Sequence, residues 1–595
     1  MLTKAMQILQ QYFGYSSFRP GQEQIVDSIL SGRDTVGIMP TGGGKSICYQ
    51  VPAMLMDGVT IVISPLISLM KDQVDVLQSM GIPATQINSS LGFREAANRL
   101  EKARQGEYKL LYIAPERLEA ESFLTLLHEM PVPFVAVDEA HCVSQWGHDF
   151  RPSYLKITSF LQALPKRPIV AALTATATPE VTEDIRKQLS LEDEQVFITG
   201  FGRDNLILSV RKGENRRDFV HEYLKANRQQ AGIIYASTRK DVDELYENLL
   251  KRGHSVTRYH AGLSEVERAR NQEAFLFDDV TVMVATNAFG MGIDKSNVRY
   301  CIHYNMPKNL EAYYQEAGRA GRDGEMSECI LLFHPQDIQT QSFFIEQNQQ
   351  GSERKPYEYK KLYAMVEYCR TPKCLQQTIL QYFGETSAST CGQCSNCTND
   401  QELVDITVEA QKIFSCVKRM KERYGASLIA QVLKGSKNKK LIQFGLDQLP
   451  TYGVMKEYTE QEIVDMIQLL IADGYLTVKE SKYPIVMLSD RVVPVLRGEE
   501  TVWQKILLRP KHQQEDNDDL FERLRQLRKE ISQQEGVPPF VIFHDSTLKE
   551  LSRLCPDDKQ AMLAVKGIGA SKFEKYGHQF LALLQEYKAE TSVGI

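Results

Sequence analysis

A glycine-rich segment near the N-terminus, MPTGGGKS at residues 39–46, has the composition of a phosphate-binding loop. Its three consecutive glycines would let backbone N–H groups turn toward phosphate oxygens. Lys45 would place a positive charge beside the β- and γ-phosphates, and the Ser46 hydroxyl is a ligand for Mg²⁺. A chance glycine turn is the alternative interpretation. We expect this phosphate loop to bind a nucleoside triphosphate through Thr41, Gly42, Gly43, Gly44, Lys45 and Ser46.

Two adjacent carboxylates follow an apolar run farther along the chain, in PFVAVDEAH at 133–141. Asp138, at the end of the expected strand, is suited to hold Mg²⁺ through water. Glu139 is then suited to act as the base or to orient the attacking water. Alone, this pair is a weak signal, because such residues often mark a solvated strand end. Together with the phosphate loop, it predicts hydrolysis of the bound triphosphate.

A second basic motif, YYQEAGRAGRDG at 313–324, carries Arg319 and Arg322 three residues apart, which predicts one helical face. Negative charge builds on the γ-phosphate during transfer, so a cation reaching that phosphate would accelerate the reaction. We expect Arg322 to be this cation, with Arg319 and Gln315 as companions. A surface network of salt bridges is the alternative interpretation.

Four of the eleven cysteines crowd together in the spacing C-x16-C-x2-C-x2-C. Glycine and serine within STCGQCSNC permit tight turns, so four thiolates could converge on one tetrahedral Zn²⁺. Disulfides and an iron–sulfur cluster are the alternatives, and disulfides are unusual in cytosolic proteins. Cys369, just upstream, is not counted as a ligand. The predicted zinc ligands are Cys374, Cys391, Cys394 and Cys397.

Short apolar runs must position these groups, and they alternate with amphipathic helical stretches from about residue 34 to 210. TVGIM, VTIVIS, KLLYIA, FVAVDEA and IVAALTAT are typical of buried strands in a parallel sheet. A second set begins near residue 231 with AGIIYA, SVTRYH, VTVMVAT and VRYCIHY, and ends with ECILLF. Two such units predict an α/β protein with two similar lobes facing a cleft. One large doubly wound domain is the alternative.

The alternation stops after about residue 335. A helical region then ends in the cysteine cluster, and the next segment has helices with a strand pair, YLTVKE and YPIVML, as in a small winged-helix domain. A polar acidic stretch precedes a last all-helical unit. The predicted divisions are 1–207 and 208–340 for the lobes, 341–404 for zinc binding, 405–510 for the winged helix, 511–519 for a linker and 520–595 for the helical end.

Composition limits the classes of function only weakly. The 595 residues are 43% hydrophobic and 25% charged, with a formal net charge of −6, as in ordinary globular proteins. This charge excludes a uniformly basic protein but permits a local basic stripe for nucleic acid. Because no run reaches about 18 apolar residues and no signal peptide is evident, we expect a cytoplasmic protein without a membrane span.

The segments together resemble the RecQ family of superfamily 2 DNA helicases, which have two RecA-like lobes followed by zinc-binding, winged-helix and HRDC domains. The resemblance covers the whole chain. The motifs in family order are YFGYSSFRPGQEQ, MPTGGGKS, SPLISLMKDQ, DEAH, LTATAT, FGMGID and QEAGRAGRDG. Met39 replaces the first glycine of the general phosphate-loop motif, a departure that is frequent in helicase-type motors. The resemblance implies ATP-dependent, 3′-to-5′ unwinding of DNA in recombination, repair and replication-fork processing, with ATP, Mg²⁺ and Zn²⁺ as cofactors.

The resemblance also assigns roles that the residue types alone leave open. It implies that Tyr15, Arg19 and Gln22 hold the adenine, since a ring can stack on the base and an amide can pair with its edge. It further implies that an aromatic-rich loop, CVSQWGHDFRPSY at 142–154, couples DNA contact to ATP hydrolysis. A tryptophan packed under the sheet is the alternative. The residues of this loop expected to meet DNA are Trp146, His148, Phe150, Arg151 and Tyr154.

Further sites follow from the resemblance. Thr174 and Thr176 would couple the two lobes, and Asp294 would approach the nucleotide from the second lobe. Thr286 and Asn287 would contact the DNA phosphates. Independently of the resemblance, the four lysines of KGSKNKK, beside a helix end, predict a phosphate-contact patch for duplex DNA, with a solvated loop as the alternative. The lysines of that segment expected to bind duplex DNA are Lys437, Lys439 and Lys440.

The C-terminal modules are less informative. The wing near Tyr483 is short, which leaves a strand-separating role open, and the HRDC-like end is not strongly basic. Expected partners are single-stranded and duplex DNA and a single-stranded-DNA-binding protein docked on the winged helix; a monomer is favoured. A motor acting on RNA and a binding protein with an inactive ATPase are the rival functions.

Overall fold

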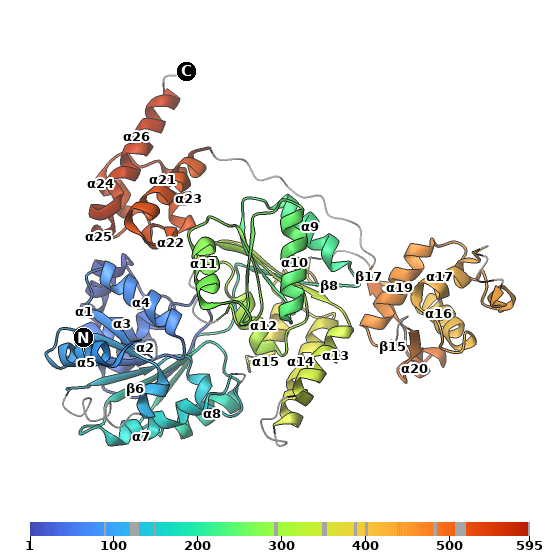
Figure 1. Cartoon of the computed structure of the whole chain (residues 1–595), viewed down its shortest axis with the longest axis horizontal. Helices are drawn as coiled ribbons and strands as arrows, with labels where there is room; N and C mark the ends of the chain where they lie inside the picture. The colour runs from blue at the N-terminus through green and yellow to red at the C-terminus, as the bar shows by residue number, and fades with distance from the viewer. Residues whose placement is uncertain are drawn as a thin grey trace.

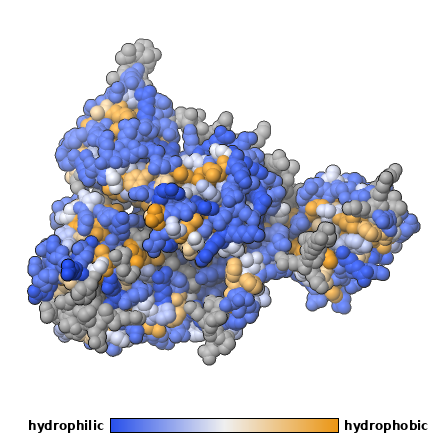
Figure 2. Space-filling view, in the orientation of Figure 1, coloured by the Kyte–Doolittle hydropathy of each residue, from blue (hydrophilic) through white to orange (hydrophobic). Residues whose placement is uncertain are grey.

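The computed structural model describes residues 1–88, 91–119, 130–147, 149–290, 295–347, 354–385, 389–398, 403–436, 438, 441, 443–479, 485–505 and 519–592. Figure 1 shows two lobes with sheets, a helical domain at the right-hand end and another helical domain above the first lobe. Hydrophilic residues prevail on the face drawn in Figure 2. Within the described ranges, no helix is long and apolar enough to cross a membrane.

The first lobe is a seven-stranded parallel sheet in the order β3-β4-β2-β5-β6-β1-β7. Its five expected inner strands are buried along most of their length, because helices cover both faces. The two edge strands, β3 and β7, were not predicted. The strands are β1 (Thr35–Ile38), β2 (Thr60–Ile63), β3 (Ala84–Ile87), β4 (Leu110–Ile113), β5 (Phe134–Val137), β6 (Ile169–Thr174) and β7 (Gln195–Ile198).

The helices of this lobe begin with α1 at the N-terminus and end with α8 before the last strand. Short 3-10 segments, η2 to η4, lie around the aromatic-rich loop and its neighbours. The helical elements of this lobe are α1 (Leu2–Ile8), η1 (Leu9–Phe13), α2 (Gln22–Leu30), α3 (Lys45–Leu55), α4 (Ile67–Ser79), α5 (Phe93–Arg104), η2 (Pro115–Glu119), η3 (Ala140–Val143), η4 (Pro152–Leu155), α7 (Lys156–Ala163) and α8 (Pro179–Gln188).

The second lobe is a six-stranded parallel sheet in the order β10-β11-β9-β12-β13-β8. Two lobes are therefore present, as predicted. The set starts earlier than expected, because β8 begins at Leu206 and the predicted boundary after residue 207 falls inside it. The elements are β8 (Leu206–Lys212), α9 (Arg216–Ala226), β9 (Ala231–Tyr235), α10 (Arg239–Lys251), β10 (Val256–Tyr259), α11 (Glu265–Leu276), β11 (Val282–Ala285), β12 (Val298–His303), α12 (Leu310–Ala317) and β13 (Ser327–Phe333).

Three helices then pack against the lobes, namely α13 (Gln336–Gln347), α14 (Lys355–Arg370) and α15 (Leu375–Tyr382). Buried side chains of α14 and α15 belong to the same apolar core as strands of both lobes. This region therefore shares its hydrophobic core with the lobes, and it carries the cysteine cluster at its end.

The winged-helix region has its own core and is joined to the second lobe by the ion pair between Lys212 Nζ and Asp473 Oδ1, 2.8 Å apart. The predicted strand pair is confirmed as the antiparallel β15 and β16, while the turn with Tyr483 lies outside the described residues. Its elements are β14 (Leu403–Asp405), α16 (Thr407–Arg419), α17 (Ala426–Lys434), η5 (Leu446–Gln448), α19 (Glu460–Ala472), β15 (Leu476–Lys479), β16 (Ile485–Leu488), α20 (Val492–Leu496) and β17 (Trp503–Lys505).

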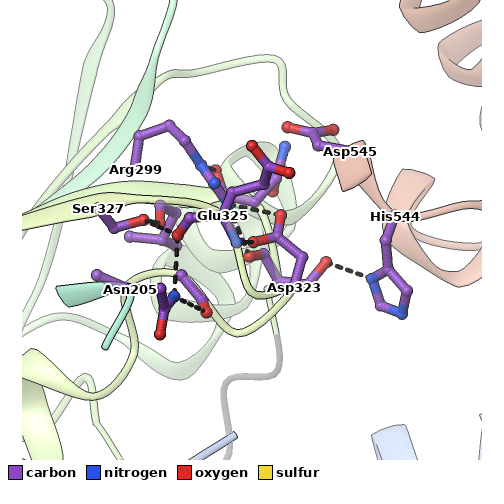
Figure 3. A network of polar contacts seen from close by, with 12 residues as sticks. Asn205, Arg299, Asp323, Glu325, Ser327, His544 and Asp545 are labelled. Atoms are coloured by element: carbon purple, nitrogen blue, oxygen red, sulfur yellow. Dashed lines mark hydrogen bonds and ion pairs between the residues drawn. The ribbon is translucent and has the colours of Figure 1, made fainter. Parts of the chain in front are cut away.

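The C-terminal domain is all-helical, as predicted, and has a separate core. It packs on the second lobe, where His544 Nδ1 lies 2.8 Å from Ser296 Oγ (Figure 3). It also meets the first lobe, since a Cβ atom at Gly14 would lie 3.0 Å from Gly569 N. Its elements are α21 (Asp519–Glu535), α22 (Pro539–Ile542), α23 (Asp545–Leu554), α24 (Lys559–Ala564), α25 (Ala570–Lys572), η6 (Phe573–Gly577) and α26 (His578–Ser592).

Candidate active site and nucleic-acid interface

The phosphate loop connects β1 to α3, the strand–loop–helix arrangement that phosphate binding requires. Gly44 has φ +81° at the helix start, and a Cβ atom there would lie 2.4 Å from Gln22 Nε2, so glycine is needed. Burial lowers the pKa of Lys45, while the carboxylates of Glu139 and Asp138 oppose that shift. Lys45 therefore lies among the groups expected to handle Mg²⁺ and the phosphates.

The carboxylates of Asp138 and Glu139 follow β5, at the edge of the sheet where the phosphate loop follows β1. Burial and the neighbouring Glu139 raise the pKa of Asp138 to about 7, while Lys45 opposes the shift. A bound divalent cation would instead favour the ionised carboxylate. Asp138 and Ser46 thus fit the ligand chemistry of Mg²⁺, which takes oxygen donors from one or two side chains and keeps several waters.

Glu139 has left-handed backbone geometry, with φ +46°, which is uncommon outside glycine and concentrates at functional sites. Burial would raise its pKa, but the hydrogen bond and charge of His141 and the charge of Lys45 lower the pKa to about 2. Glu139 is therefore ionised at neutral pH and able to orient a water molecule. His141 Nδ1 lies 3.3 Å from Glu139 Oε2 and 2.8 Å from Thr174 Oγ1.

The residues expected to hold adenine contact the phosphate loop directly. Gln22 Nε2 donates to the carbonyls of Gly43 and Gly44, at 3.1 and 3.0 Å, and Arg19 donates through Nη1 to the Gly42 carbonyl. Tyr15 is half-buried and packs against the apolar cluster under α1, α2 and α3. The structure therefore brings Arg19 and Gln22 to the phosphate loop.

The second lobe presents its arginines to the phosphate loop. A Cβ atom at Gly42 would lie 3.6 Å from Arg322 Cα, and the Arg322 charge contributes to the lowered pKa of Lys45, after the larger effect of burial. The prediction that Arg319 and Arg322 share a helical face was wrong. Helix α12 ends at Ala317, and the chain then turns through Gly321, which has φ +60°.

Arg319 is only 4% exposed, and its charge helps to lower the pKa of Glu139. Gln315 is buried on the last turn of α12. Arg319 is therefore close enough to Glu139 for the two charges to interact. Asp294 lies outside the described residues.

Arg203 bridges the lobes, and the sequence analysis did not identify it. Its Nη1 donates to the Thr41 carbonyl of the phosphate loop, and its Nη2 donates to the carbonyls of Ala320 and Gly321, at 3.0 and 2.9 Å. Burial lowers the pKa of this guanidinium. The only available signal was an arginine in the FGRDN segment between the two lobes, with no recognisable spacing to either motif.

The four predicted zinc ligands converge, with all Sγ atoms within 4.8 Å of one another. Two Sγ–Sγ distances are 4.0 Å, Cys391 to Cys397 and Cys374 to Cys394, which fits a tetrahedral ion and is far too long for disulfides. Burial opposes ionisation of Cys374, but backbone N–H groups of Cys391 and Gln377 lower its pKa to about 7. A thiolate at this position is therefore available to Zn²⁺.

The aromatic-rich loop follows the carboxylates directly. The Trp146 side chain is 42% exposed, so the alternative of a tryptophan packed under the sheet does not hold. Phe150 is half-buried under the guanidinium of Arg354, 5.6 Å from the ring centroid. Arg151 is tied to lobe 1, because its Nη1 donates to the Pro65 carbonyl at 2.9 Å. His148 lies outside the described residues.

Tyr154 does not offer the stacking face that was expected of it. Its side chain is completely buried, and its hydroxyl donates to the Asp138 carbonyl at 3.0 Å. The reason is local, since residues 152–155 form the 3-10 segment η4, which turns the ring into the core of the lobe. Tyr154 therefore positions the backbone of Asp138 and does not offer its ring to a base.

A cavity of about 480 Å³ lies beside the aromatic-rich loop, between the two lobes and helices α13 and α14. Phe150 lines it from the first lobe, Asn287 from the second, and Arg354 from α14. Thr286 is buried at the end of β11, next to the exposed Asn287. An aromatic face, an amide and a cation around one groove suit a single nucleic-acid strand. Lys437, Lys439 and Lys440 lie outside the described residues.

Five family models match successive parts of the chain. They are the DEAD/DEAH box helicase (residues 19–185), the helicase conserved C-terminal domain (215–324), RecQ zinc-binding (335–398), the RQC domain (400–514) and the HRDC domain (517–584). Their order is the order of the regions described above.

Curated relatives match over the full length. The ATP-dependent DNA helicase RecQ of Bacillus subtilis is 51% identical over 99% of this chain and 100% of the relative. The chain belongs to the RecQ family of ATP-dependent DNA helicases. The RecQ protein of Haemophilus influenzae is 39% identical over 98% of this chain and 96% of that relative.

Membership in the RecQ family agrees with the cofactors that the residues accommodate. The enzyme hydrolyses ATP with Mg²⁺, and the RecQ zinc-binding region holds Zn²⁺ with its four cysteines. ATP supplies the energy of unwinding, and Zn²⁺ organises a closed structural site.

Proposed function

We propose that this chain moves 3′-to-5′ along one DNA strand, unwinding the duplex ahead of it in recombination, repair and replication-fork processing. The observation that supports coupled motion best is the continuity of one short segment. It runs from Asp138 and Glu139 at the end of β5 to the exposed Trp146. DNA bound in the groove would then affect the position of the two carboxylates that act on ATP.

For the reaction, we propose that Lys45 binds the β- and γ-phosphates and that Ser46 and Asp138 hold Mg²⁺. Glu139 orients the attacking water, and Arg322 stabilises the charge that develops on the γ-phosphate. The supporting observations are the mutual charge effects among these groups and the packing of Arg322 against the loop. Arg319 and Gln315 assist Arg322, and Asp294 approaches the nucleotide from the second lobe. Thr41 and the three loop glycines help to bind the phosphates. Tyr15, Arg19 and Gln22 hold the adenine.

For DNA, we propose that the strand stacks on Trp146 and Phe150 and that its phosphates meet Asn287 and Thr286. Arg151 supports the loop from lobe 1, and His148 takes part from the same loop. Duplex DNA ahead of the lobes would meet the winged-helix lysines Lys437, Lys439 and Lys440. The exposure of Trp146 and the aromatic and amide groups around the groove support this assignment.

We also propose domain limits, with the first lobe ending at residue 205, because β8 belongs to the second sheet. The second lobe would then span 206–335 and the zinc-binding region 336–402, because α13 and β14 each belong whole to the following region. The winged helix would span 403–510, the linker 511–518 and the helical end 519–595, since α21 begins at Asp519. The protein would act as a monomer in the cytoplasm, associated with the nucleoid, and its winged helix would dock a single-stranded-DNA-binding protein.

The decisive experiment is an unwinding assay on duplexes with a 3′ or a 5′ single-stranded tail, with ATP and Mg²⁺. We expect unwinding of the 3′-tailed duplex only. Preference for the 5′ tail would overturn the polarity. ATPase stimulation by single-stranded RNA above that by DNA would overturn the substrate.

A further inference from the structure

A buried lysine joins three parts of the molecule that are far apart in sequence. Lys361, on α14, is 3% exposed. Its Nζ lies 2.9 Å from Glu311 Oε1, on α12 of the second lobe. The same Nζ donates to the main-chain carbonyl of Trp146, in the aromatic-rich loop of the first lobe, at 3.0 Å.

This arrangement is specific because its charges are shielded from water. Glu311 is also 3% exposed, so each charge of the pair depends on the other for stabilisation. The ammonium group also lies 4.8 Å from the ring centroid of Tyr357, one turn earlier on α14, an additional cation–π contact. Moving α12 or α14 alone would therefore separate a buried ion pair, and moving the loop alone would remove a hydrogen bond from the buried ammonium group.

Helix α14 holds Trp146 in a second way. The Trp146 ring meets the edge of the Tyr357 ring, with centroids 5.3 Å apart and planes at 64°. The backbone of the loop is thus bound by Lys361 and its ring by Tyr357, while much of the indole remains exposed. A base that stacks on Trp146 would compete with, or shift, the contact to Tyr357.

Glu311 connects this junction to the catalytic groups. It lies four residues before Gln315, one turn away on α12, and the chain continues from the end of that helix to Arg319 and Arg322. Because α12 is a rigid helix with every residue buried, displacement of Glu311 would be carried to the turn that faces the phosphate loop.

We propose that Lys361 is a positioning residue that couples DNA occupancy at Trp146 to the placement of α12 and its arginines. This inference rests on the proposed role of Trp146 as a DNA contact. The zinc-binding region would then act in the motor itself, through α14, in addition to stabilising the chain around its metal. Lys361 touches no substrate and acts through Glu311 and the loop.

The test replaces Lys361 with methionine in the full-length, zinc-loaded protein, with Lys360→Met as the matched control. Lys360 is the adjacent residue on α14 and is exposed. We expect Lys361→Met to keep basal ATPase activity within about twofold but to lose roughly tenfold of its stimulation by single-stranded DNA, the usual size of coupling between sites. Lys360→Met should match the parent protein.

Folding is controlled by a second variant. Lys361→Met alone leaves the buried Glu311 without its ion-pair partner, so the double variant with Glu311→Gln removes both charges. We expect the double variant to fold with the parent's melting temperature within a few degrees and still to lack DNA stimulation. Full stimulation in either folded variant would overturn the proposal.

Tryptophan fluorescence provides a readout that a purely structural role would not move. With Trp503→Phe, Trp146 is the remaining tryptophan of the chain. We expect the Trp146 emission of DNA-free Lys361→Met to differ from that of the DNA-free parent, because the loop loses its contact with Lys361. Emission identical to that of the DNA-free parent would contradict the proposal. If Trp146→Ala keeps full DNA stimulation, the proposed function of the loop fails; if only Lys361→Met keeps it, this inference alone fails.

Discussion

His141 Nδ1 lies 2.8 Å from Thr174 Oγ1, a hydrogen bond that joins η3, just after β5, to the end of β6. His141 is completely buried and also approaches Glu139, at 3.3 Å. The LTATAT segment is therefore connected to the carboxylate of Glu139 through one imidazole. Displacement of this segment would change the hydrogen bonding of His141 and, through it, the environment of Glu139.

Thr174→Val should weaken this connection without changing side-chain volume. We expect ATP affinity to be retained, while the unwinding rate falls about tenfold more than the ATPase rate, because a buried hydrogen bond of about 1–3 kcal/mol is lost between coupled elements. The measurement is the number of base pairs opened per ATP hydrolysed. Thr60→Val is the control, since Thr60 is buried in the same sheet and its hydroxyl has no partner in the described part of the chain.

Lys45→Ala should abolish hydrolysis while single-stranded DNA is still bound, because Lys45 lies at the phosphate loop and apart from the DNA groove.

Glu139→Gln should keep ATP binding and lose roughly 100-fold or more in turnover, as expected for a residue that orients or deprotonates water. For both variants, ATPase assays measure the loss of hydrolysis, and fluorescence anisotropy with labelled DNA measures DNA binding. Normal ATPase activity of Lys45→Ala would refute the site.

Trp146→Ala should raise the dissociation constant for single-stranded DNA by roughly tenfold, since one base–aromatic stack contributes about 1–3 kcal/mol. Stimulation of the ATPase should fall as well. Trp503→Ala serves as the control, because this tryptophan is 51% exposed but lies in the winged-helix region. Equal losses in both variants would indicate a general effect of removing an exposed ring.

Removal of zinc should unfold the region around the cysteine cluster, because metal-binding energy in such a site is folding energy. We expect one Zn²⁺ per chain in the parent protein. Chelation, or Cys394→Ser, should reduce both the helical circular-dichroism signal and the melting temperature. The Cys369→Ser variant should retain one Zn²⁺ per chain, because Cys369 is not among the four converging thiols. A chelated sample with full helicity and thermal stability would contradict the prediction.

The C-terminal domain should separate from the lobes when the charge of Glu325, at its interface with the second lobe, is reversed. Glu325 Oε2 lies 2.5 Å from Lys549 Nζ, so Glu325→Lys would create repulsion next to the His544–Ser296 contact. We expect a larger radius of gyration by small-angle X-ray scattering. The double variant Glu325→Lys and Lys549→Glu should restore the compact form. An unchanged radius in the single variant would exclude this docking in solution.

Much of the site follows from short stretches of sequence. The phosphate loop, the Asp138–Glu139 pair and the cysteine triplet depend on neighbouring residues, whose geometry is constrained by strand ends and tight turns. The central strands were predictable because continuous apolar runs are needed where helices cover both faces. The edge strands β3 and β7 lack such runs, and β8 joins its sheet only through pairing with β13, more than a hundred residues away.

The sequence by itself determined the chemistry of this protein, namely a triphosphate site, a thiolate metal site and the α/β lobes that support them. Tertiary structure decided which groups act together. Arg203 and Lys361 meet their partners across the lobes, and neither has a local spacing that could reveal the contact. Tyr154 turned inward and α12 ended before Arg319, because burial and the left-handed turn at Gly321 outweighed the expected helical and loop geometry. Long-range packing, which no local pattern encodes, set these relationships.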